Sequence, residues 1–334
     1  MQKDETIASG HSRRTFLKQA TAGAAASLLL PRWSFAAPPS GRLQHACIGV
    51  MGMGRSDRGE INASDKVDIV ALCDIDGRAL KQAAQAHPGA RLYRDWREML
   101  DREEKNIDSV NISIPDHMHA PAAMSAIRTG KHVFCKKPLT HDVYEAPKLT
   151  LAAHDPDVDT KMGIQIHAHD FYRTAVQWLQ EGAIGKIREW HSWSSASYSR
   201  EDGARPAGAD PIPAEVDWDL WLGSAPERPY KDAIYHPFEW RRWRDFGTGA
   251  TGDFGCHIFD PVFTALGIGA PLSIKAQVES EKEEVWPAWA VYNYEFPGTE
   301  FTTGATIHAS WPETGKKPER QLSPRFAGGH ELRN

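Results

Sequence analysis

The chain has 334 residues, which is enough for two domains of ordinary size. Hydrophobic residues make up 41% and charged residues 25%, an average globular composition that excludes a disordered or fibrous protein. The net charge of −5 gives no basic footprint for nucleic acid, and four widely spaced cysteines without a C-x-x-C pair argue against a disulfide scaffold or a zinc ribbon.

The first segment, residues 1–37, resembles a twin-arginine export signal. The Arg13-Arg14 pair precedes a short apolar run from Ala22 to Leu30, and small residues follow at Ala36 and Ala37, where a peptidase could cut. We therefore expect a periplasmic or otherwise exported protein without stable membrane insertion once the signal is removed. Two alternatives remain open, namely a helical N-terminal arm and an uncleaved membrane anchor.

Residues 40–165 are predicted to form an α/β domain. Short apolar runs alternate there with stretches of helical spacing, a pattern typical of βαβ units and of a doubly wound (Rossmann) parallel sheet with helices on both faces. The expected strands cover residues 43–50, 67–73, 109–114 and 132–135, and the expected helices cover residues 79–87 and 121–129.

Residues 166–334 are predicted to form a second, α+β domain for substrate binding and oligomerisation. A helical stripe of apolar residues ends at Gly182, and six of the twelve tryptophans lie between residues 190 and 244. Period-2 segments at 292–296 and 301–311 predict an open, mainly antiparallel sheet with one covered face. The tail after Trp311 lacks strand periodicity, so a truncated C-terminus is one interpretation.

A glycine-rich turn follows the first expected strand, in the sequence Gly49-Val50-Met51-Gly52-Met53-Gly54. Gly49 and Gly54 fit the first and third positions of a Gly-x-Gly-x-x-Gly dinucleotide turn, which places a diphosphate at a helix N-terminus. The middle position is Met51 rather than glycine, so close approach of the diphosphate depends on Gly52 beside it. We take residues 49 and 51–54 as candidate cofactor contacts.

Asp74 ends the second expected strand 20 residues after Gly54. A carboxylate at this spacing typically binds the ribose hydroxyls of the adenosine and repels a 2′-phosphate. The sequence therefore favours NAD over NADP. A plain tight turn that binds no nucleotide is the alternative.

Two further segments carry a family resemblance. The strand ending in Cys135-Lys136-Lys137-Pro138 and the helix-like stretch Gly252-Asp253-Phe254-Gly255-Cys256-His257 make the chain resemble the glucose–fructose oxidoreductase/inositol dehydrogenase/rhizopine catabolism (Gfo/Idh/MocA) family. In that family a Glu-Lys-Pro motif supplies a catalytic lysine, and an Asp-x-x-x-His pair supplies the acid/base histidine and its neighbour. The resemblance implies catalytic roles for Lys137, Asp253 and His257, with Lys136 in place of the usual glutamate.

The chemistry of hydroxyl oxidation explains these residue types. Histidine titrates near neutrality, so His257 suits a general base, and the Lys137 ammonium would stabilise a developing alkoxide and contact the cofactor. Asp253 and His257 are spaced i and i+4, which places them on one helix face. Taken singly, such a lysine or Asp–His pair is usually a solvated surface feature.

The resemblance adds weaker candidates. It implies cofactor contacts at Pro115 and His119 and substrate contacts at Tyr172 and Arg173, and a tryptophan such as Trp243 could stack on a sugar. For each of these, a loop, surface or core role is an equal or stronger alternative. His167 and His169 share one side of an expected strand, but without further ligands we expect no metal.

These residues lead to three hypotheses. The first is an exported NAD-dependent oxidoreductase that acts on a hydroxyl of a sugar or cyclic polyol with a tightly bound cofactor. The second is an NAD-dependent glycoside hydrolase that oxidises its substrate only transiently, and the third is a non-catalytic sugar-binding relative. The resemblance also implies a homo-oligomer, and the sequence does not identify the sugar.

Overall fold

The structure is a computed structural model that describes residues 41–154, 157–200, 203–279 and 282–313. Contacts between residues separate residues 43–334, which form one unit, from residues 1–42. The predicted export signal, residues 1–37, lies outside the described residues. Within the part of the chain that the structure describes, no helix combines the length and apolar character that a membrane span requires.

A six-stranded sheet occupies the first half of the unit formed by residues 43–334, in the strand order β3-β2-β1-β4-β5-β6. All neighbouring strands are parallel, which confirms the predicted doubly wound sheet. The strands and their connecting helices, in chain order, are β1 (Leu43–Ile48), α2 (Met53–Asn62), β2 (Val67–Cys73), α3 (Gly77–Ala86), β3 (Arg91–Tyr93), α4 (Trp96–Arg102), β4 (Ser109–Ile112), the 3₁₀ turn η1 (Asp116–Met118), α5 (His119–Arg128), β5 (His132–Lys136), α6 (Glu145–Ala152) and β6 (Thr160–Gly163).

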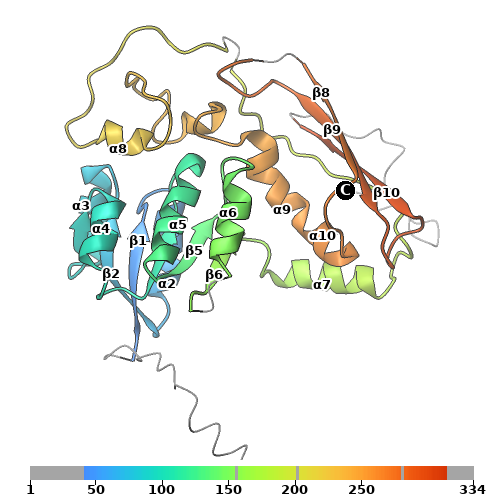
Figure 1. The fold of residues 1–334 in the computed structure, drawn as a ribbon, viewed down its shortest axis with the longest axis horizontal. Helices are drawn as coiled ribbons and strands as arrows, with labels where there is room; N and C mark the ends of the chain where they lie inside the picture. The colour runs from blue at the N-terminus through green and yellow to red at the C-terminus, as the bar shows by residue number, and fades with distance from the viewer. Residues whose placement is uncertain (1–40, 155–156, 201–202, 280–281, 314–334) are drawn as a thin grey trace, which may run out of the picture. The chain divides into compact units, whose positions relative to one another are not determined.

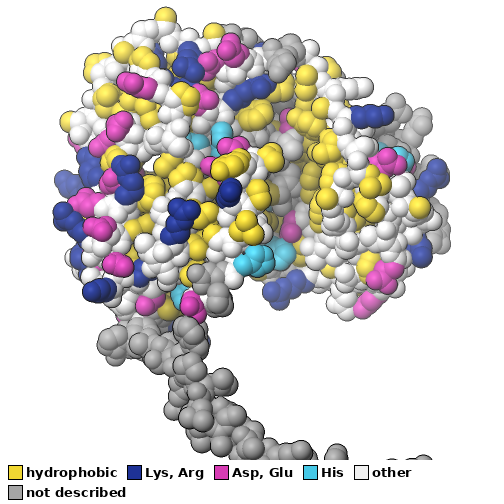
Figure 2. Space-filling view, in the orientation of Figure 1, with side chains coloured by type: hydrophobic (Ala, Val, Ile, Leu, Met, Phe, Trp, Pro, Cys, Tyr) yellow, Lys and Arg dark blue, Asp and Glu magenta, His cyan; other side chains and the backbone are white. Residues whose placement is uncertain are grey.

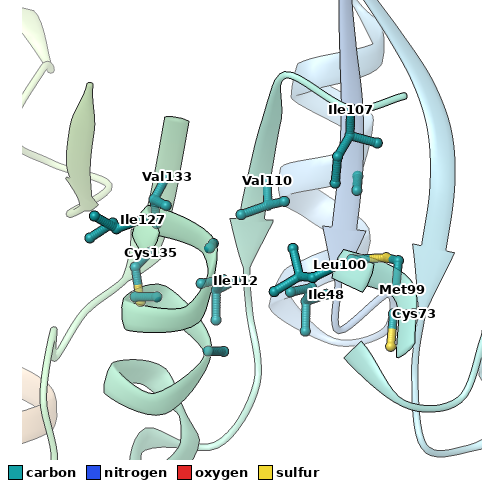
Figure 3. Packing of buried hydrophobic residues seen from close by; sticks show 14 of the residues in the cluster. Ile48, Cys73, Met99, Leu100, Ile107, Val110, Ile112, Ile127, Val133 and Cys135 are labelled. Atoms are coloured by element: carbon teal, nitrogen blue, oxygen red, sulfur yellow. The ribbon is translucent and has the colours of Figure 1, made fainter. Parts of the chain in front are cut away.

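Helices cover both faces of this sheet, as Figure 1 shows. On one face, apolar residues of β1, β4 and β5 pack against α4, α5 and α6 in a buried cluster that includes Ile48, Ile112, Met99 and Cys135 (Figure 3). On the other face, a smaller cluster joins β1 and β2 to α3. Burial of this apolar surface drives folding of the sheet.

The second half contains a four-stranded sheet in the order β7-β10-β9-β8. Strand β9 pairs antiparallel with β8 and β10, whereas β7 runs parallel to β10, so the sheet is mainly antiparallel as predicted. Its elements, with the helices between them, are α7 (Asp170–Gln180), β7 (Glu189–His191), α8 (Trp218–Leu222), the 3₁₀ turn η2 (Glu239–Arg242), the π-helical turn η3 (Thr251–Gly255), α9 (Cys256–Ile258), α10 (Asp260–Leu266), β8 (Ser273–Val278), β9 (Ala290–Pro297) and β10 (Thr306–Pro312).

One face of this second sheet is covered. Trp190, Phe296 and Ile307 from three strands pack against Leu266 of α10, with Phe263 at the edge of the cluster. The alternation of apolar residues along β9 and β10 places every second side chain on this face. The opposite face carries mostly polar residues of the same strands, including His191, Asn293 and Ser310.

A segment between the sheets packs along the carboxyl edge of the first sheet. Backbone hydrogen bonds join Gly77 to Glu215 and Asp217 to Ile75, at 2.8 and 3.1 Å. Behind this contact lies an aromatic core formed by Trp218, Trp221, Tyr230, Tyr235, Trp240, Trp243 and Phe246. The tryptophan-rich stretch therefore folds over the edge where ligands bind in parallel sheets.

The surface carries mixed charges. On the face drawn in Figure 2, basic and acidic side chains are interspersed and gather in no single patch.

Candidate active site

The glycine-rich turn joins β1 to α2. Gly49 has a φ of 81°, and a Cβ atom at this position would lie 2.3 Å from the backbone oxygen of Ser113. A Cβ atom at Gly54 would lie 2.0 Å from the backbone oxygen of Gly49. Both residues must be glycine, because any side chain would separate the helix from the strands.

Gly52 supplies the open part of the turn. It is the N-cap of α2 with a φ of 55° and no side-chain cap, and a Cβ atom there would meet no atom of the described residues within 4 Å. Met51 and Met53 beside it are 37% and 42% exposed. The uncapped helix start and the open space fit a diphosphate, which a helix N-terminus attracts.

Asp74 lies directly after β2, next to this turn. Its carboxylate accepts hydrogen bonds from the backbone N–H groups of Val50 (2.9 Å) and Asp76 (3.0 Å). Burial raises the pKa of Asp74, although these two hydrogen bonds oppose the shift. Asp74 thus also holds the turn in place, and its predicted contact with the ribose stays a prediction.

Lys137 and Asp253 form the centre of the candidate site. Lys137 follows β5, and Asp253 lies in η3. The Lys137 ammonium donates to the Asp253 carboxylate and, at 3.0 Å, to the Asp253 backbone oxygen. Burial alone would raise the pKa of Asp253. The charge of Lys137 and the hydrogen bonds that the Asp253 carboxylate accepts hold this pKa below its ordinary value.

Two residues of the second half complete the surroundings of Asp253. The phenol of Tyr198 donates to its second carboxylate oxygen, and burial together with this hydrogen bond raises the pKa of Tyr198. The Arg241 guanidinium lies 3.9 Å from the same oxygen and stacks on the rings of Trp240 and Phe238. The Asp253 carboxylate is therefore held from three sides by cations and a hydroxyl.

His257 lies one turn after Asp253, at the start of α9. The turn η3, which contains Asp253, is π-helical, a geometry that is frequent at functional sites. The Nδ1 atom of His257 is buried, and no described residue forms a hydrogen bond with it. Burial and the nearby Lys137 charge lower the pKa of His257, so the ring is neutral at neutral pH. Lys137 thus contacts Asp253, and the charges of both act on His257; the catalytic roles of the three residues stay a prediction.

Lys136 has a different partner from Lys137. Its ammonium lies 2.8 Å from the Asp57 carboxylate of α2. The two adjacent lysines therefore each contact a carboxylate of their own.

Asp116 is a buried carboxylate that the sequence analysis did not select. It accepts hydrogen bonds from the Thr248 backbone N–H (3.2 Å) and hydroxyl (2.8 Å), and burial raises its pKa to about 6. The charges of Lys137, Asp253 and Arg241 act on it as well. Its position after β4, at the carboxyl edge of the sheet, is the signal that could have found it.

His119 connects the segments that follow β4 and β5 through its ring. Its ring nitrogens lie 2.6 Å from the backbone oxygen of Pro138 and 2.7 Å from that of Ile114, and burial lowers its pKa to about 4. Both nitrogens face carbonyl groups, so neither is available for a cofactor and the predicted contact is corrected. Pro115 is half-buried and precedes η1.

Three weaker candidates lie elsewhere. Trp243 is fully buried in the aromatic core and donates to the Ile234 backbone oxygen, so the prediction that it contacts substrate is wrong. The Tyr172 hydroxyl lies 2.7 Å from Thr264 of α10, two turns beyond His257, and Arg173 is exposed on α7. No contact of the described residues connects either side chain to the Lys137–Asp253 pair.

The two histidines weighed as metal ligands lie in the turn before α7 rather than on a strand. His167 contacts Asp260 at 2.7 Å, and His169 caps α7 by accepting from the Phe171 backbone N–H. Each ring thus has a local partner of its own.

The sequence analysis also missed Tyr198 and Arg241. Tyr198 lies in a loop after β7, and Arg241 lies in a short 3₁₀ turn. Neither position carries a hydrophobic period or a motif. Only the folded chain brings them to Asp253.

Residues 43–162 match the family described as an oxidoreductase family with an NAD-binding Rossmann fold. Residues 192–302 match the C-terminal alpha/beta domain of the same oxidoreductase family. The two matches cover the first sheet and much of the second half, including Asp253 and His257.

Two curated proteins illustrate the similarity. Levoglucosan dehydrogenase from Pseudarthrobacter phenanthrenivorans is 26% identical over 167 residues, 50% of this chain and 34% of that protein. A glycosyl hydrolase family 109 protein from Stenotrophomonas maltophilia is 36% identical over 137 residues, 37% of this chain and 29% of that protein. The chain thus spans about a third of the length of these curated relatives.

A solved structure agrees with the fold. The WlbA dehydrogenase from Bordetella pertussis, in complex with NADH and UDP-GlcNAcA, covers 84% of this chain and 75% of its own with a TM-score of 0.60. Its sequence identity is 17%, so the likeness concerns the fold alone.

Proposed function

Because the chain belongs to the Gfo/Idh/MocA oxidoreductase family, we propose that it is an NAD-dependent dehydrogenase acting on a hydroxyl group of a sugar or cyclic polyol. The observation that carries this proposal is the grouping of Lys137, Asp253 and His257 at the carboxyl edge of a nucleotide-binding sheet. The buried Nδ1 atom of His257 has no hydrogen-bond partner among the described residues, so it can form a hydrogen bond with a ligand.

The residues have distinct roles in this proposal. His257, neutral because its pKa is lowered, accepts the proton of the substrate hydroxyl. The Lys137 ammonium stabilises the negative charge that develops on that oxygen, and Asp253 holds the ammonium in place. NAD, when bound, supplies the acceptor for the hydride that leaves the same carbon. In the reverse direction the protonated His257 acts as the acid.

The cofactor contacts are proposed from the geometry of the turn. The open space at Gly52 and the uncapped start of α2 support binding of the diphosphate, and Asp74 at the end of β2 supports binding of the ribose. Met51, Met53 and Pro115 are proposed as further contacts along the same edge.

The predicted export signal leads to a further part of the proposal. We propose a periplasmic or otherwise exported enzyme that retains NAD tightly, because little free nicotinamide cofactor exists outside the cytoplasm to exchange with. Such an enzyme must reoxidise its cofactor within each cycle. A homo-oligomer remains part of the proposal on the family resemblance alone.

A second candidate is an NAD-dependent glycoside hydrolase. The 36% identity to a glycosyl hydrolase family 109 protein favours it. In that reaction, transient oxidation of a ring hydroxyl to a ketone would acidify the neighbouring C–H and allow elimination of the leaving group. Water would then add to the double bond so formed, and the hydride taken up by NAD would return to reduce the ketone. Lys137 and His257 would serve both reactions.

One experiment tests the proposal. The purified full chain is denatured, and any released nucleotide is identified by mass spectrometry. Release of NAD, together with NADH formation on a panel of sugars and polyols, supports the dehydrogenase. Sugar release from an aryl glycoside without net NADH formation supports the hydrolase instead. A protein that neither carries nor binds a dinucleotide supports a non-catalytic sugar-binding relative.

The His257→Ala variant separates chemistry from structure. We expect it to abolish turnover and to retain the nucleotide. Loss of the nucleotide as well would mean that His257 supports the fold rather than the reaction.

A further inference from the structure

Asp57 of α2 and Lys136 of β5 form an ion pair that the reaction itself does not require. The Nζ atom of Lys136 lies 2.8 Å from Oδ1 of Asp57, and the two side chains are only 8% and 11% exposed. A charge buried to this extent is costly unless it is paired. Removal of either residue would therefore leave the charge of the other buried and unpaired.

The second oxygen of Asp57 reaches another strand. Oδ2 accepts a hydrogen bond of 2.7 Å from the hydroxyl of Ser113, which follows β4, and Asn111 of β4 donates to that hydroxyl at 3.0 Å. The backbone oxygen of Ser113 is the atom that leaves no room for a side chain at Gly49. Asp57 thus connects α2 to the ends of two strands, beside the glycine-rich turn.

The stem of Lys136 occupies space that a glycine provides. Lys136 pairs with Gly163 of β6, where a Cβ atom would lie 3.0 Å from Cδ of the lysine. The next residue along β5 is Lys137, which contacts Asp253. The pair therefore lies between the start of α2 and the proposed reaction centre.

We propose that the Asp57–Lys136 pair is a positioning element for the dinucleotide, which fixes α2 relative to the Lys137 end of β5. This inference rests on the proposed NAD-dependent function. Glutamate, the residue expected at position 136 from the family motif, would stand beside Asp57 with the same charge. The lysine at 136 and the aspartate at 57 thus form a matched set in this chain.

A charge swap in the full chain tests the proposal. Any bound nucleotide is first removed, and the dissociation constant of NAD is then measured by calorimetry. We expect Lys136→Glu to raise this constant by about tenfold or more, because like charges would push α2 away from β5. The double variant Asp57→Lys/Lys136→Glu is expected to return it to within about threefold of the wild-type value. The milder Asp57→Asn variant, expected to raise it by about fivefold, covers the case in which Lys136→Glu does not fold.

A control variant separates positioning from stability. Glu103 is a buried carboxylate, 2% exposed, that pairs with Arg91 away from the glycine-rich turn. We expect Glu103→Gln to lower the thermal midpoint without changing the NAD dissociation constant.

Two results would overturn the inference. If the position 57 and 136 variants lower only the thermal midpoint, as Glu103→Gln does, the pair is merely structural while the proposed function stands. If the wild-type chain binds no NAD, the proposed function and this inference both fail.

Discussion

Lys137 donates to Asp253 twice, once to its carboxylate and once to its backbone oxygen 3.0 Å away. The two residues are 116 positions apart in the sequence, yet the backbone contact ties the ammonium to the π-helical turn itself. His257 follows one turn later, so its ring is held in a fixed relation to the same ammonium. The pair therefore sets the geometry of the proposed reaction centre.

The first prediction concerns Lys137. We expect Lys137→Met to lower kcat by about 100-fold or more, because the developing alkoxide loses its cation. NAD affinity should change far less. Initial rates of NADH formation and calorimetric titration with NAD measure the two effects.

Lys131 provides the control for Lys137. It is a buried lysine just before β5 whose ammonium contacts the Glu104 backbone oxygen, away from the site. Lys131→Met should leave kcat unchanged. An equal loss of kcat in both variants would contradict the role of Lys137.

The second prediction concerns Tyr198. Tyr198→Phe removes the hydroxyl that donates to Asp253 but keeps the ring. We expect kcat to fall about tenfold, since a hydrogen bond to a charged group is lost, while NAD affinity stays the same. The pKa of Asp253 should rise, so the acid limb of the kcat profile should move to higher pH. An unchanged pH profile would mean that Tyr198 does not act through Asp253.

The third prediction concerns the glycines of α2. Gly54→Ala places a Cβ atom 2.0 Å from the Gly49 backbone oxygen, so we expect about 1–3 kcal/mol lower unfolding free energy and loss of NAD binding. Gly59 lies in the same helix with open space around it, and Gly59→Ala should raise stability by up to about 1 kcal/mol. Chemical denaturation and NAD titration compare the two. Equal unfolding free energies and equal NAD affinities of the two variants would show that close packing at Gly54 is not needed for stability or NAD binding.

Short apolar runs, alternating with stretches of helical spacing, predicted the larger strands of the first sheet. β1, β2, β4 and β5 lie within or close to the predicted ranges. β3 escaped prediction because it has only three residues, and β6 because Thr160–Gly163 contains no apolar run. Such short edge strands are specified by their neighbours rather than by their own pattern.

Motif spacing predicted the central site residues but not their surroundings. Lys137, Asp253 and His257 carry a recognisable pattern, whereas Tyr198 and Arg241 reach Asp253 only through tertiary packing. Trp243 shows the opposite error. Tryptophan occurs both in buried cores and in sugar-binding sites, so the sequence could not tell which of the two contains Trp243.

The last prediction concerns pH and stability. His45, His117 and His119 are buried, and burial lowers the pKa of each from 6.5 to about 4. In the unfolded chain these rings take up protons below about pH 6.5, whereas in the folded chain they stay neutral down to about pH 4. Stability should therefore fall as the pH is lowered through this window, by up to about 3 kcal/mol for each histidine.

Asp116 acts in the opposite direction. Its pKa is raised to about 6, so it contributes stability as the pH falls, and the raised pKa of Asp74 acts in the same direction. The three histidines, together with the lowered pKa values of His87, His236 and His257, outweigh these two carboxyls. The net expectation is a thermal midpoint that decreases steadily from about pH 7 to about pH 5, as followed by circular dichroism. His45→Gln should flatten this decrease, because the glutamine can still bind Ser109 or Asn111 without titrating. His154→Gln, at an exposed position, should leave the slope unchanged. A midpoint that stays constant or rises on acidification would contradict the assignment of these histidines as neutral, buried groups.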